Sequence, residues 1–470
     1  MIEKFRKPKN GQTMHLILIV LFLFLSVCLI VKGCTSTTQD PDIGSNILPQ
    51  DPIINDPILQ PNVPHVVSTA RVGITGSLYI QDPVIESTKT ESGQYDFSQI
   101  FATVSQSYQS YDYMIAHLET TLGGTSAGEF SGDKKFNTPD SLIPALKEAG
   151  IDMLLTSNNH CYDTGHEGFI RTQEILNENK MAYTGTRLNT ATANYTIQEI
   201  NGVKLGMICY THETGDTAEG NKTIRDIVVD SEDTDLINSF NYRQMEQFYE
   251  EVKAAMEAMD SAGADYTLFF IHWGNEFDLV PSGTQKKVAQ NLCEIGVDFI
   301  IGSHPHIVQP MELLTSESGS STYCLYSAGN ALSSQRRRNT VAANATNGHT
   351  EDGVILSIKF EKWDDGSVKI ADLNATPLWV DAAASGENTA YSIIPVDVTY
   401  NFYPALTSFA NKVNNVVDPQ RDPFAQISYA PSDPTQIGAS YNRTMDTVLD
   451  GLNECRQALG LQPVSNTPGT

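Results

Sequence analysis

Basic residues are scarce in this chain of 470 residues, which contains 30 Lys and Arg against 56 Asp and Glu and has a formal net charge of −26. A general nucleic-acid binder is excluded, because phosphate contacts require clustered Lys and Arg side chains. The same deficit disfavours adsorption to anionic lipid. Global disorder is also excluded, because 40% of the residues are hydrophobic and 18% are charged, which is enough to build a full core.

Closely spaced cysteine pairs are missing as well. The seven cysteines include no CxxC pair, which excludes a zinc ribbon and a dithiol redox motif. Two of them, Cys28 and Cys34, lie near the N-terminus. An odd number remains, so at least one thiol is unpaired within the chain, and we expect most to be small buried apolar residues. These five are Cys161, Cys209, Cys293, Cys324 and Cys455.

One long apolar run is present, at residues 14–32, directly behind a basic segment at residues 1–13. A helix of about 20 apolar residues spans a bilayer, and flanking basic residues stay on the cytoplasmic side. The run therefore predicts a transmembrane or signal anchor, with the bulk of the chain extracellular. The sequence Val31-Lys-Gly-Cys34 also resembles a bacterial lipobox, so a single-pass anchor and a lipid anchor at Cys34 both stay open.

Three further segments follow the anchor. Residues 33–67 scatter six prolines among Asp, Asn and Gln, which is typical of an extended linker. Residues 68–385 carry regular hydrophobic patterning and are the expected folded domain. Residues 386–470 are expected to be a C-terminal extension that is partly helical, with one helix from Ser440 to Leu459.

The expected domain alternates strands with helices and becomes rich in strands near its end. This order predicts an α/β domain, layered as a sandwich of mixed β-sheets flanked by helices. The expected helices span residues 138–150, 240–262 and 284–295, the first from Thr138 as cap to Gly150 as stop. The expected strands span residues 71–77, 113–117, 151–156, 266–271, 297–301, 323–328, 353–360 and 367–380.

Histidines gather where these strands end. The chain has 10 His, and five of them follow or close a predicted strand, at positions 117, 160, 272, 304 and 306. Ligands bind at such strand ends in open α/β sheets. Imidazole and carboxylate ligands suit zinc, manganese or iron, and a bound ion lowers the pKa of its water. A further histidine that is not a ligand would protonate a leaving group.

Each of these residues also has a purely structural interpretation. His272 would then be a hydrogen-bonded strand residue, Asp163 a helix cap, Pro305 part of a turn and Trp273 part of the core. Independent caps and turns would not bring His, Asn and Glu to the same end of successive strands. We therefore favour the functional interpretation for the set as a whole.

The order of the motifs resembles the CapA family of poly-γ-glutamate capsule biosynthesis proteins, which are related in fold to calcineurin-like metallophosphoesterases. The resemblance covers about residues 70–380. It rests on Ile74-Thr-Gly-Ser77, His117-Leu-Glu-Thr-Thr121, Phe136-Asn-Thr-Pro139, Ser157-Asn-Asn-His-Cys-Tyr-Asp-Thr-Gly165, Ile271-His-Trp-Gly-Asn-Glu-Phe277, Gly302-Ser-His-Pro-His306 with Gln309, and Tyr326-Ser-Ala-Gly-Asn330.

The resemblance implies roles for individual residues. One metal would be held by Asn159, His272 and His304, the other would be served by His306, and Glu119 would take the place of a bridging carboxylate. His160 would donate a proton to the leaving group, with Asp163 orienting it. Three further residues are expected to line the substrate site, namely Asn158, Glu276 and Asn330.

One position departs from the family pattern. Family members usually carry Gly-Asp where this chain has Gly76-Ser77, and that Asp resembles a ligand of the first metal. A neutral hydroxyl is a much poorer ligand than a carboxylate, so the first metal position is expected to be weak or empty. We therefore expect one tightly bound divalent ion, Mn, Zn or Fe, rather than two.

Two functions remain open for the chain. The resemblance implies a membrane-anchored hydrolase of capsule biosynthesis, which uses metal-bound water on a phosphoester or on the amide links of poly-γ-glutamate or a similar polymer. The alternative is a non-catalytic subunit that binds or exports the polymer as part of a membrane synthase complex. An anionic polymer is repelled by so acidic a chain. Basic clusters at Arg336, Arg337 and Arg338, and at Lys134 and Lys135, are the expected places where it is tolerated.

Overall fold

The computed structural model describes residues 63–215, 221–337, 349–385, 388–396 and 433–465. The predicted anchor at residues 14–32, and with it Cys34, lies outside the described residues. Within those ranges, no helix is both long and apolar enough to cross a membrane. The two β-sheets that form the centre of the fold carry the following strands, named in spatial order.

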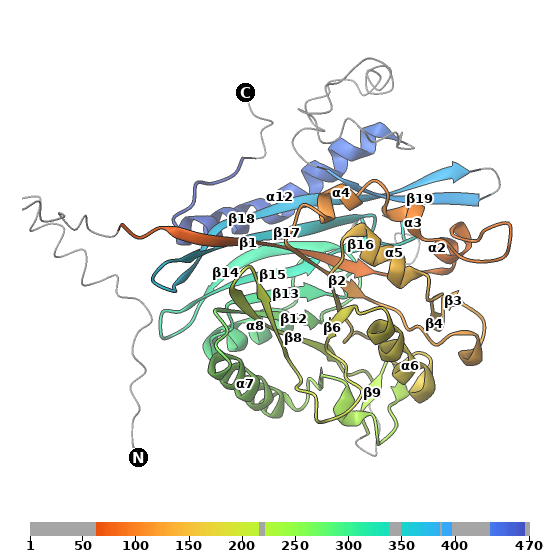
Figure 1. Cartoon of the computed structure of the whole chain (residues 1–470), viewed down its shortest axis with the longest axis horizontal. Helices are drawn as coiled ribbons and strands as arrows, with labels where there is room; N and C mark the ends of the chain where they lie inside the picture. Colours follow the sequence, from red (N-terminus) through yellow and green to blue (C-terminus); the bar gives the residue numbers. More distant parts are fainter. Residues whose placement is uncertain (1–62, 216–220, 338–348, 386–387, 397–432, 466–470) are drawn as a thin grey trace, which may run out of the picture. The chain divides into compact units, whose positions relative to one another are not determined.

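The first sheet places four parallel strands beside three antiparallel ones (Figure 1). Its order is β19 (Asn388–Pro395), β18 (Val368–Ser385), β17 (Asp352–Trp363), β1 (Val66–Leu78), β2 (Tyr113–Leu118), β5 (Met153–Leu155) and β6 (Ala182–Thr184), with β16 (Asn330–Leu332) also paired to β1. The second sheet has the order β11 (Ser239–Phe240), β8 (Val203–His212), β12 (Tyr266–His272), β13 (Phe299–Ser303), β15 (Ser321–Ala328) and β14 (Val308–Thr315), with β7 (Thr196–Ile200) paired to β8.

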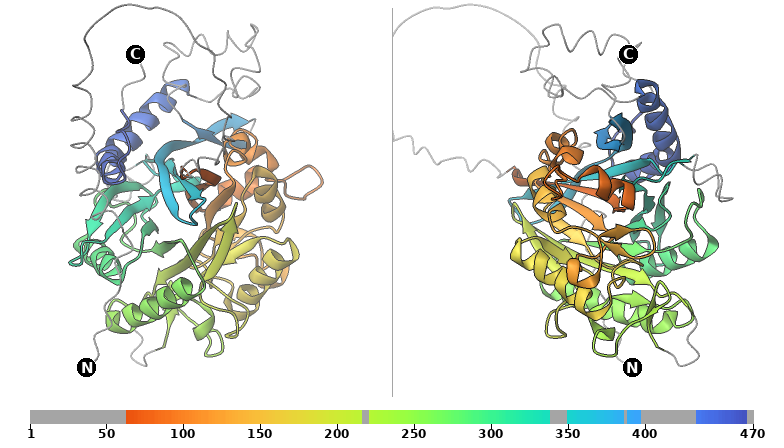
Figure 2. Two further views of the ribbon diagram at one scale, coloured as in Figure 1. Left: turned by 60° about the vertical axis from the view of Figure 1, so that its left-hand side comes forward. Right: turned by 90° about the vertical axis from the view of Figure 1, so that its right-hand side faces the viewer.

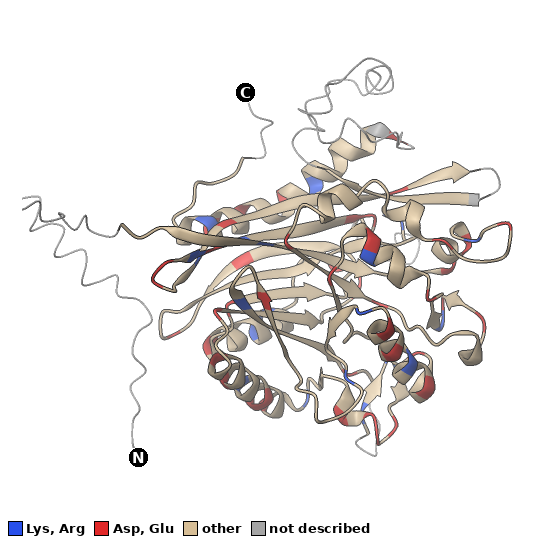
Figure 3. Cartoon of the chain, in the orientation of Figure 1, with Lys and Arg blue, Asp and Glu red and all other residues tan. Residues whose placement is uncertain are grey.

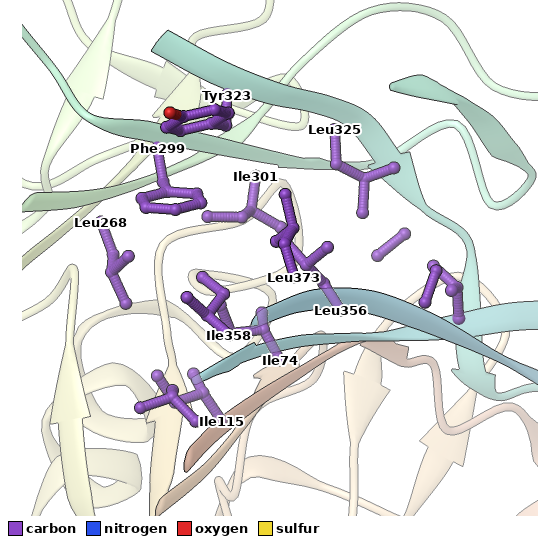
Figure 4. Packing of buried hydrophobic residues seen from close by; sticks show 14 of the residues in the cluster. Ile74, Ile115, Leu268, Phe299, Ile301, Tyr323, Leu325, Leu356, Ile358 and Leu373 are labelled. Carbon is purple, nitrogen blue, oxygen red and sulfur yellow. The ribbon is translucent and has the colours of Figure 1, made fainter. Parts of the chain in front are cut away.

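The two sheets pack face to face through one apolar core (Figure 4). Alternate residues of each strand enter this core, as the two-residue period of a strand requires. In β1 these include Val72 and Ile74, and in β12 they include Leu268 and Phe270. The predicted sandwich of mixed sheets flanked by helices is therefore confirmed.

Helices cover the outer faces of both sheets. The first sheet packs against the short helices α2 (Asp82–Ser87), α3 (Ser98–Phe101) and α4 (Ser105–Tyr108) and against α5 (Leu142–Ala149). The second packs against α7 (Met245–Ser261) and α8 (Gly283–Ile295). Asp and Glu residues recur along α6 (Gly165–Glu178) and α7 (Figure 3), and each of these helices buries only some of its residues.

Smaller elements complete the described chain. Two hairpins are formed by β3 (Ser131–Gly132) with β4 (Phe136–Asn137) and by β9 (Thr223–Ile224) with β10 (Ile227–Val228), and two 3₁₀ turns are η1 (Thr125–Ala127) and η2 (Thr234–Leu236). The predicted helices and strands are present, with shifted ends. The helix expected from Thr138 starts at Leu142 and ends, as expected, before Gly150, which has a φ of 103°.

The fold continues past residue 385, where the sequence placed the end of the domain. β19 extends the first sheet, and α12 (Pro434–Ala458) lies against β14 and β18, one strand from each sheet (Figure 2). Ile437, Met445 and Leu452 of α12 are buried in the core between the sheets. Part of the expected extension is therefore structural. All five cysteines after the N-terminal region are free and buried, as expected.

Candidate metal centre

The carboxyl ends of parallel strands from both sheets meet at one place. β2 ends just before Glu119, and β5 leads into the loop with Asn159 and His160. β12 ends at His272 and β13 leads into His304 and His306. Parallel strands present their carboxyl ends at the same edge of a sheet, which is why residues so far apart in the sequence converge here.

Glycines permit the close approach of the strands at this edge. A Cβ atom on Gly76 of β1 would lie 2.0 Å from the carbonyl oxygen of Gly329, and one on Gly302 of β13 would lie 1.9 Å from that of Tyr326. No larger residue fits without moving the backbone. The backbone after β13 is also unusual, because His304 and His306 have φ values of 94° and 56°. Such conformations are costly for residues other than glycine and are held by the surrounding contacts.

Three imidazoles and one carboxylate form the centre of the site. Nε2 of His272 lies 3.1 Å from Nδ1 of His304 and 2.9 Å from Oδ1 of Asn159. Oε1 of Glu119 lies 3.5 Å from Nε2 of His272 and 3.6 Å from Nε2 of His306. Glu119, His272 and His304 thus offer metal-ligand atoms within 4.8 Å of one another. A second group with ligand atoms equally close together consists of Glu276, His304 and His306.

Several of these candidate ligand atoms have no hydrogen-bond partner. Both carboxylate oxygens of Glu119 and Nε2 of His306 are buried and make no hydrogen bond to any residue that the structure describes. A buried carboxylate without partners is strongly unfavourable unless something compensates its charge. Ligand atoms about 2.1 Å from a shared tetrahedral ion are about 3.4 Å apart, close to the separations around Glu119. The residues therefore fit a divalent cation.

The protonation states also suit ligands. Burial lowers the pKa of His272 and His304 well below the usual histidine value, and the neighbouring imidazoles lower it further. These rings are neutral at pH 7 and keep a lone pair for a cation. Burial is also the main cause that raises the pKa of Glu119. Compensation by a cation would keep that carboxylate ionised.

Other predicted site residues support the centre without facing it. The Asn158 side chain donates to the carbonyl oxygens of Leu118 and Thr156 and accepts from the amide of His160, so it shapes the loop that carries His160. Oδ1 of Asn330 lies 2.9 Å from Nδ1 of His306, and its Nδ2 donates to the backbone. Asn330 thus orients a candidate ligand. Glu276, expected only as a lining residue, belongs to a group that could hold the ion.

His160 and Asp163 form a buried pair beside the centre. Nδ1 of His160 lies 2.8 Å from Oδ2 of Asp163, and both side chains are almost fully buried. The same oxygen accepts from the backbone amide of Phe136 at 2.7 Å. The alternative interpretation of Asp163 as a helix cap is wrong, because Thr164 is the N-cap residue of α6 and Asp163 bonds elsewhere. The core interpretation of Trp273 is confirmed, since that ring is completely buried.

The predicted arginine cluster is only partly described. Nη1 of Arg336 donates to the carbonyl oxygens of Ser333 and Gln335, and its guanidinium lies 5.5 Å from the centre of the Tyr391 ring. The backbone amide of Arg337 donates to Glu351. Arg338 lies outside the described residues. These contacts tie Arg336 to its own loop and to β19, and the Arg337 backbone to the segment before β17.

Three residues of the site, His212, Ser303 and Arg225, were missed in the sequence, and His117 was identified only as a strand-end histidine. His212 closes β8, and its ring centre lies 4.8 Å from that of His304. The Ser303 hydroxyl lies 2.9 Å from Nδ1 of His272 and 3.1 Å from Nδ1 of His117, whose other nitrogen lies 3.2 Å from the Ser157 carbonyl oxygen. Arg225 reaches Asp163 from the β9–β10 hairpin. For His212 a signal was present, because it ends an apolar strand just as His272 does.

Comparisons with known proteins agree with the motif order. The relatives include the PGA biosynthesis protein CapA of Bacillus subtilis (strain 168), 24% identical over 241 residues, and the capsule biosynthesis protein CapA of Bacillus anthracis, 25% identical over 284 residues. These matches cover 50% and 59% of this chain, and they span 57% and 64% of the length of the relatives.

Solved structures resemble the chain only weakly. The NAD nucleotidase NadN of Haemophilus influenzae has a TM-score of 0.38 and 12% identity over 81% of this chain and 68% of its own. The protein TT1561 of Thermus thermophilus has a TM-score of 0.32 and 8% identity over 62% of this chain and 94% of its own. The model of the bacterial capsule synthesis protein family PGA_cap matches residues 71–335, more than half of the chain, and the chain therefore belongs to this family.

Proposed function

We propose that this chain is a metal-dependent hydrolase that acts on an anionic polymer or phosphoester in capsule biosynthesis. One observation carries the proposal: Glu119 is completely buried among imidazoles, and neither of its oxygens has a hydrogen-bond partner among the described residues. A structural carboxylate in such a place would be satisfied by donors. A carboxylate that serves as a metal ligand is expected to lack hydrogen-bond donors, because the cation takes their place.

Glu119, His272 and His304 would hold the ion, with the oxygen of Asn159 beside them. His306 and Glu276 would serve a second, weaker position. The ion supplies Lewis acidity and lowers the pKa of water when it is bound. Ser77 lies at the end of β1, where its hydroxyl is buried and close enough to Glu119 to lower the pKa of that carboxyl. It leaves the position at His306 and Glu276, which is the first metal position of the family pattern, one carboxylate short.

His160 is the proposed proton donor to the leaving group. Asp163 accepts the proton on Nδ1 of His160, which leaves Nε2 as the atom that exchanges a proton with substrate. The rings of Phe136 and Tyr79 lie 4.1 Å and 5.5 Å from the His160 ring, centre to centre, and limit the access of water. The histidine is thereby held in one orientation next to the metal residues.

The substrate and the location follow from the family and from residues 1–32. We propose a γ-linked glutamate polymer or a similar envelope polymer, since two relatives are named for PGA or capsule biosynthesis. We also propose that an anchor at residues 14–32, or a lipid on Cys34, holds the chain at the outer face of the cell membrane. A membrane polymer-synthase complex is the proposed partner.

The test compares the purified wild type with His160→Ala and His304→Ala on a phosphodiester and on γ-glutamyl oligomers, with Mn or Zn added. We expect hydrolysis of one substrate class by the wild type and a loss of at least about 100-fold in both variants. His65→Ala is the matched control, because His65 is exposed and remote from the site, and it should keep full activity. Activity that survives in His304→Ala would contradict the proposal.

A second function is favoured by one observation. Ser77 stands where the family usually has a carboxylate, which is the kind of change that abolishes a two-metal reaction. The chain would then bind or export the polymer without cleaving it. Polymer binding by the wild type without hydrolysis under any metal condition would support this alternative.

A further inference from the structure

The β9–β10 hairpin is a rigid support for one arginine. Ile224 pairs with Ile227, so the turn between the strands contains two residues, Arg225 and Asp226. Their φ values are 50° and 63°, the conformation that a tight two-residue hairpin requires. Neither is glycine or asparagine, so the turn carries a conformational cost that its surroundings must offset.

Buried contacts hold this hairpin in place. Ile224 is completely buried in a small apolar cluster with Tyr162 and Phe169, which belong to the loop after β5 and to α6. The amide of Asp226 donates to the Thr214 hydroxyl at 2.7 Å. The hairpin is thus fixed to the same loop that carries His160. Arg225 cannot move away from that loop without breaking this cluster.

The Arg225 guanidinium lies next to the proposed proton donor. Its Nη1 is 3.2 Å from Oδ2 of Asp163, the oxygen that also lies 2.8 Å from Nδ1 of His160. Nη1 also donates to the carbonyl oxygen of Lys134 at 2.6 Å, and the guanidinium lies 6.0 Å from the centre of the Phe136 ring. One carboxylate therefore separates the cation from the histidine.

Arg225 retains capacity to bind an anion. Its side chain is one third exposed, its Nη2 makes one contact of 3.5 Å to the Asp133 carbonyl oxygen, and its Nε makes no hydrogen bond within the described ranges. Two further basic residues, Lys134 and Lys135, are exposed on the segment that it touches. The exposed carboxylates of Asp133 and Asp226 are also nearby in the chain, so the cation is not part of a broad basic patch.

We propose that Arg225 binds an anionic group of the substrate, a carboxylate or a phosphate, and holds the bond to be cleaved beside His160. Arginine suits this role because its planar guanidinium forms paired hydrogen bonds to either group. The inference rests on the proposed function for its substrate and deepens it. It places the anion contact at Arg225 instead of the arginine cluster at 336–338.

A purely structural role, in which Arg225 only neutralises Asp163, makes a different prediction for binding. We would measure by calorimetry, at low salt, how the full chain binds a decamer of γ-linked glutamate, its carboxamide analogue and bis(p-nitrophenyl) phosphate. The first and third probes distinguish a carboxylate from a phosphate. The second keeps the backbone and removes the charges. The variants are Arg225→Gln, Arg225→Lys and the control Arg243→Gln, which replaces an exposed arginine away from this contact.

We expect Arg225→Gln to weaken binding of one anionic probe by at least about tenfold, Arg225→Lys to restore part of it, and Arg243→Gln to change nothing. Binding of the carboxamide analogue and the metal content should stay the same. Equal losses for the charged and uncharged probes, no loss for either, or no binding of an anion by the wild type would overturn the inference. Arginine-dependent binding without hydrolysis would support it and would contradict only the proposed hydrolase.

Discussion

The Ser303 hydroxyl connects two histidines that come from different sheets. It lies between Nδ1 of His272, a candidate ligand on β12, and Nδ1 of His117 on β2. Partners of this kind fix the ring orientation and the tautomer of a metal-ligating histidine. Ser303 therefore supports the metal centre without being a ligand.

Replacing this hydroxyl tests that support. We expect Ser303→Ala to lower the affinity for Mn or Zn by about 10- to 100-fold, because His272 loses the partner that orients its ring. The measurement is competition with a chromophoric chelator. Ser320→Ala, on the exposed loop before β15, is the matched control and should bind like the wild type. An unchanged affinity in Ser303→Ala would show that the serine does not orient the ligand.

Site residues that end an apolar strand could be predicted from the sequence, and those placed by tertiary packing could not. His272, His304 and His306 could be identified because each closes an apolar strand or lies within three residues of its end. Arg225 could not, since Ile-Arg-Asp-Ile has none of the glycine or asparagine that announces a tight hairpin. Its contact with Asp163 depends on tertiary packing between segments 62 residues apart.

At the scale of elements, α12 closes the sandwich along one side. A Cβ atom on its Gly451 would lie 1.7 Å from the carbonyl oxygen of Met311 in β14, so helix and strand touch through their backbones. Alanine favours a helix over glycine by about 1 kcal/mol. A backbone collision of this kind costs about 1–3 kcal/mol or more. It therefore outweighs the gain in helix propensity, and alanine at this position destabilises the fold.

We therefore expect Gly451→Ala to lower the melting temperature, although it improves helix propensity. Gln457→Ala places alanine at an exposed position of the same helix and should leave the melting temperature unchanged or slightly raised. Calorimetric melting of both variants beside the wild type measures the difference. A rise in Gly451→Ala would mean that α12 does not pack against β14 as described.

The start of α6 is tied to the turn at residues 230–233 by a histidine. Nδ1 of His166 lies 2.9 Å from Oδ2 of the buried Asp233, and Glu232 and Asp230 are also close. The hydrogen bond to Asp233 is the main cause that raises the pKa of His166 above 6.5. The pKa of His166 is thus higher in the folded chain than in the unfolded chain. The His166–Asp233 pair therefore stabilises the fold below about pH 6.5, and this contribution is lost as the pH rises through the pKa of the folded state.

We expect His166→Gln to lower the melting temperature more at pH 5.5 than at pH 8.5. The side chain is 38% exposed, so solvent screening keeps the effect to a few degrees or less. The measurement is thermal melting of the variant and the wild type at both pH values, with Ser320→Ala on an exposed loop as the control. A larger loss at pH 8.5 would contradict the assigned pair.

Sequence patterns predict the long helices and strands of this fold better than the ends of the helices or the edge strand β19. Long strands and amphipathic helices were predicted because burial imposes a period of two or 3.6 residues. α5 begins three residues later than its expected first position at Pro139, because residues 139–141 form turns onto the helix. β19 was missed because Tyr391-Ser-Ile-Ile-Pro395 is buried throughout and does not alternate apolar with polar residues. Its place depends on pairing with β18.

At the scale of the whole molecule, the net charge of −26 opposes the approach of an anionic polymer. Screening acts over about 10 Å at 0.1 M salt, so it weakens this long-range repulsion more than a direct contact at Arg225. We expect the association rate of a γ-linked glutamate decamer to rise between about 20 and 200 mM salt. Stopped-flow binding measures it, and a rate that falls would contradict the proposed repulsion.

The same negative charge makes a bound cation central to the proposed chemistry. The sequence predicted an α/β sandwich, a metal site at the strand ends and a weakened position at Ser77, and the structure brings Glu119, His272 and His304 within reach of one ion. The partners that complete the site, Ser303 and His212 among them, depend on how two sheets face each other. No local pattern encodes that arrangement.

The most direct test is the metal content of the purified chain. Elemental analysis by mass spectrometry, after loading with Mn, Zn or Fe and extensive dialysis, counts the tightly held ions in the wild type, Glu119→Gln and His304→Ala. We expect about one divalent ion per wild-type chain and a clear loss in both variants. Two tightly held ions would contradict the weakness assigned to Ser77, and no ion, or equal content in all three, would contradict the metal centre itself.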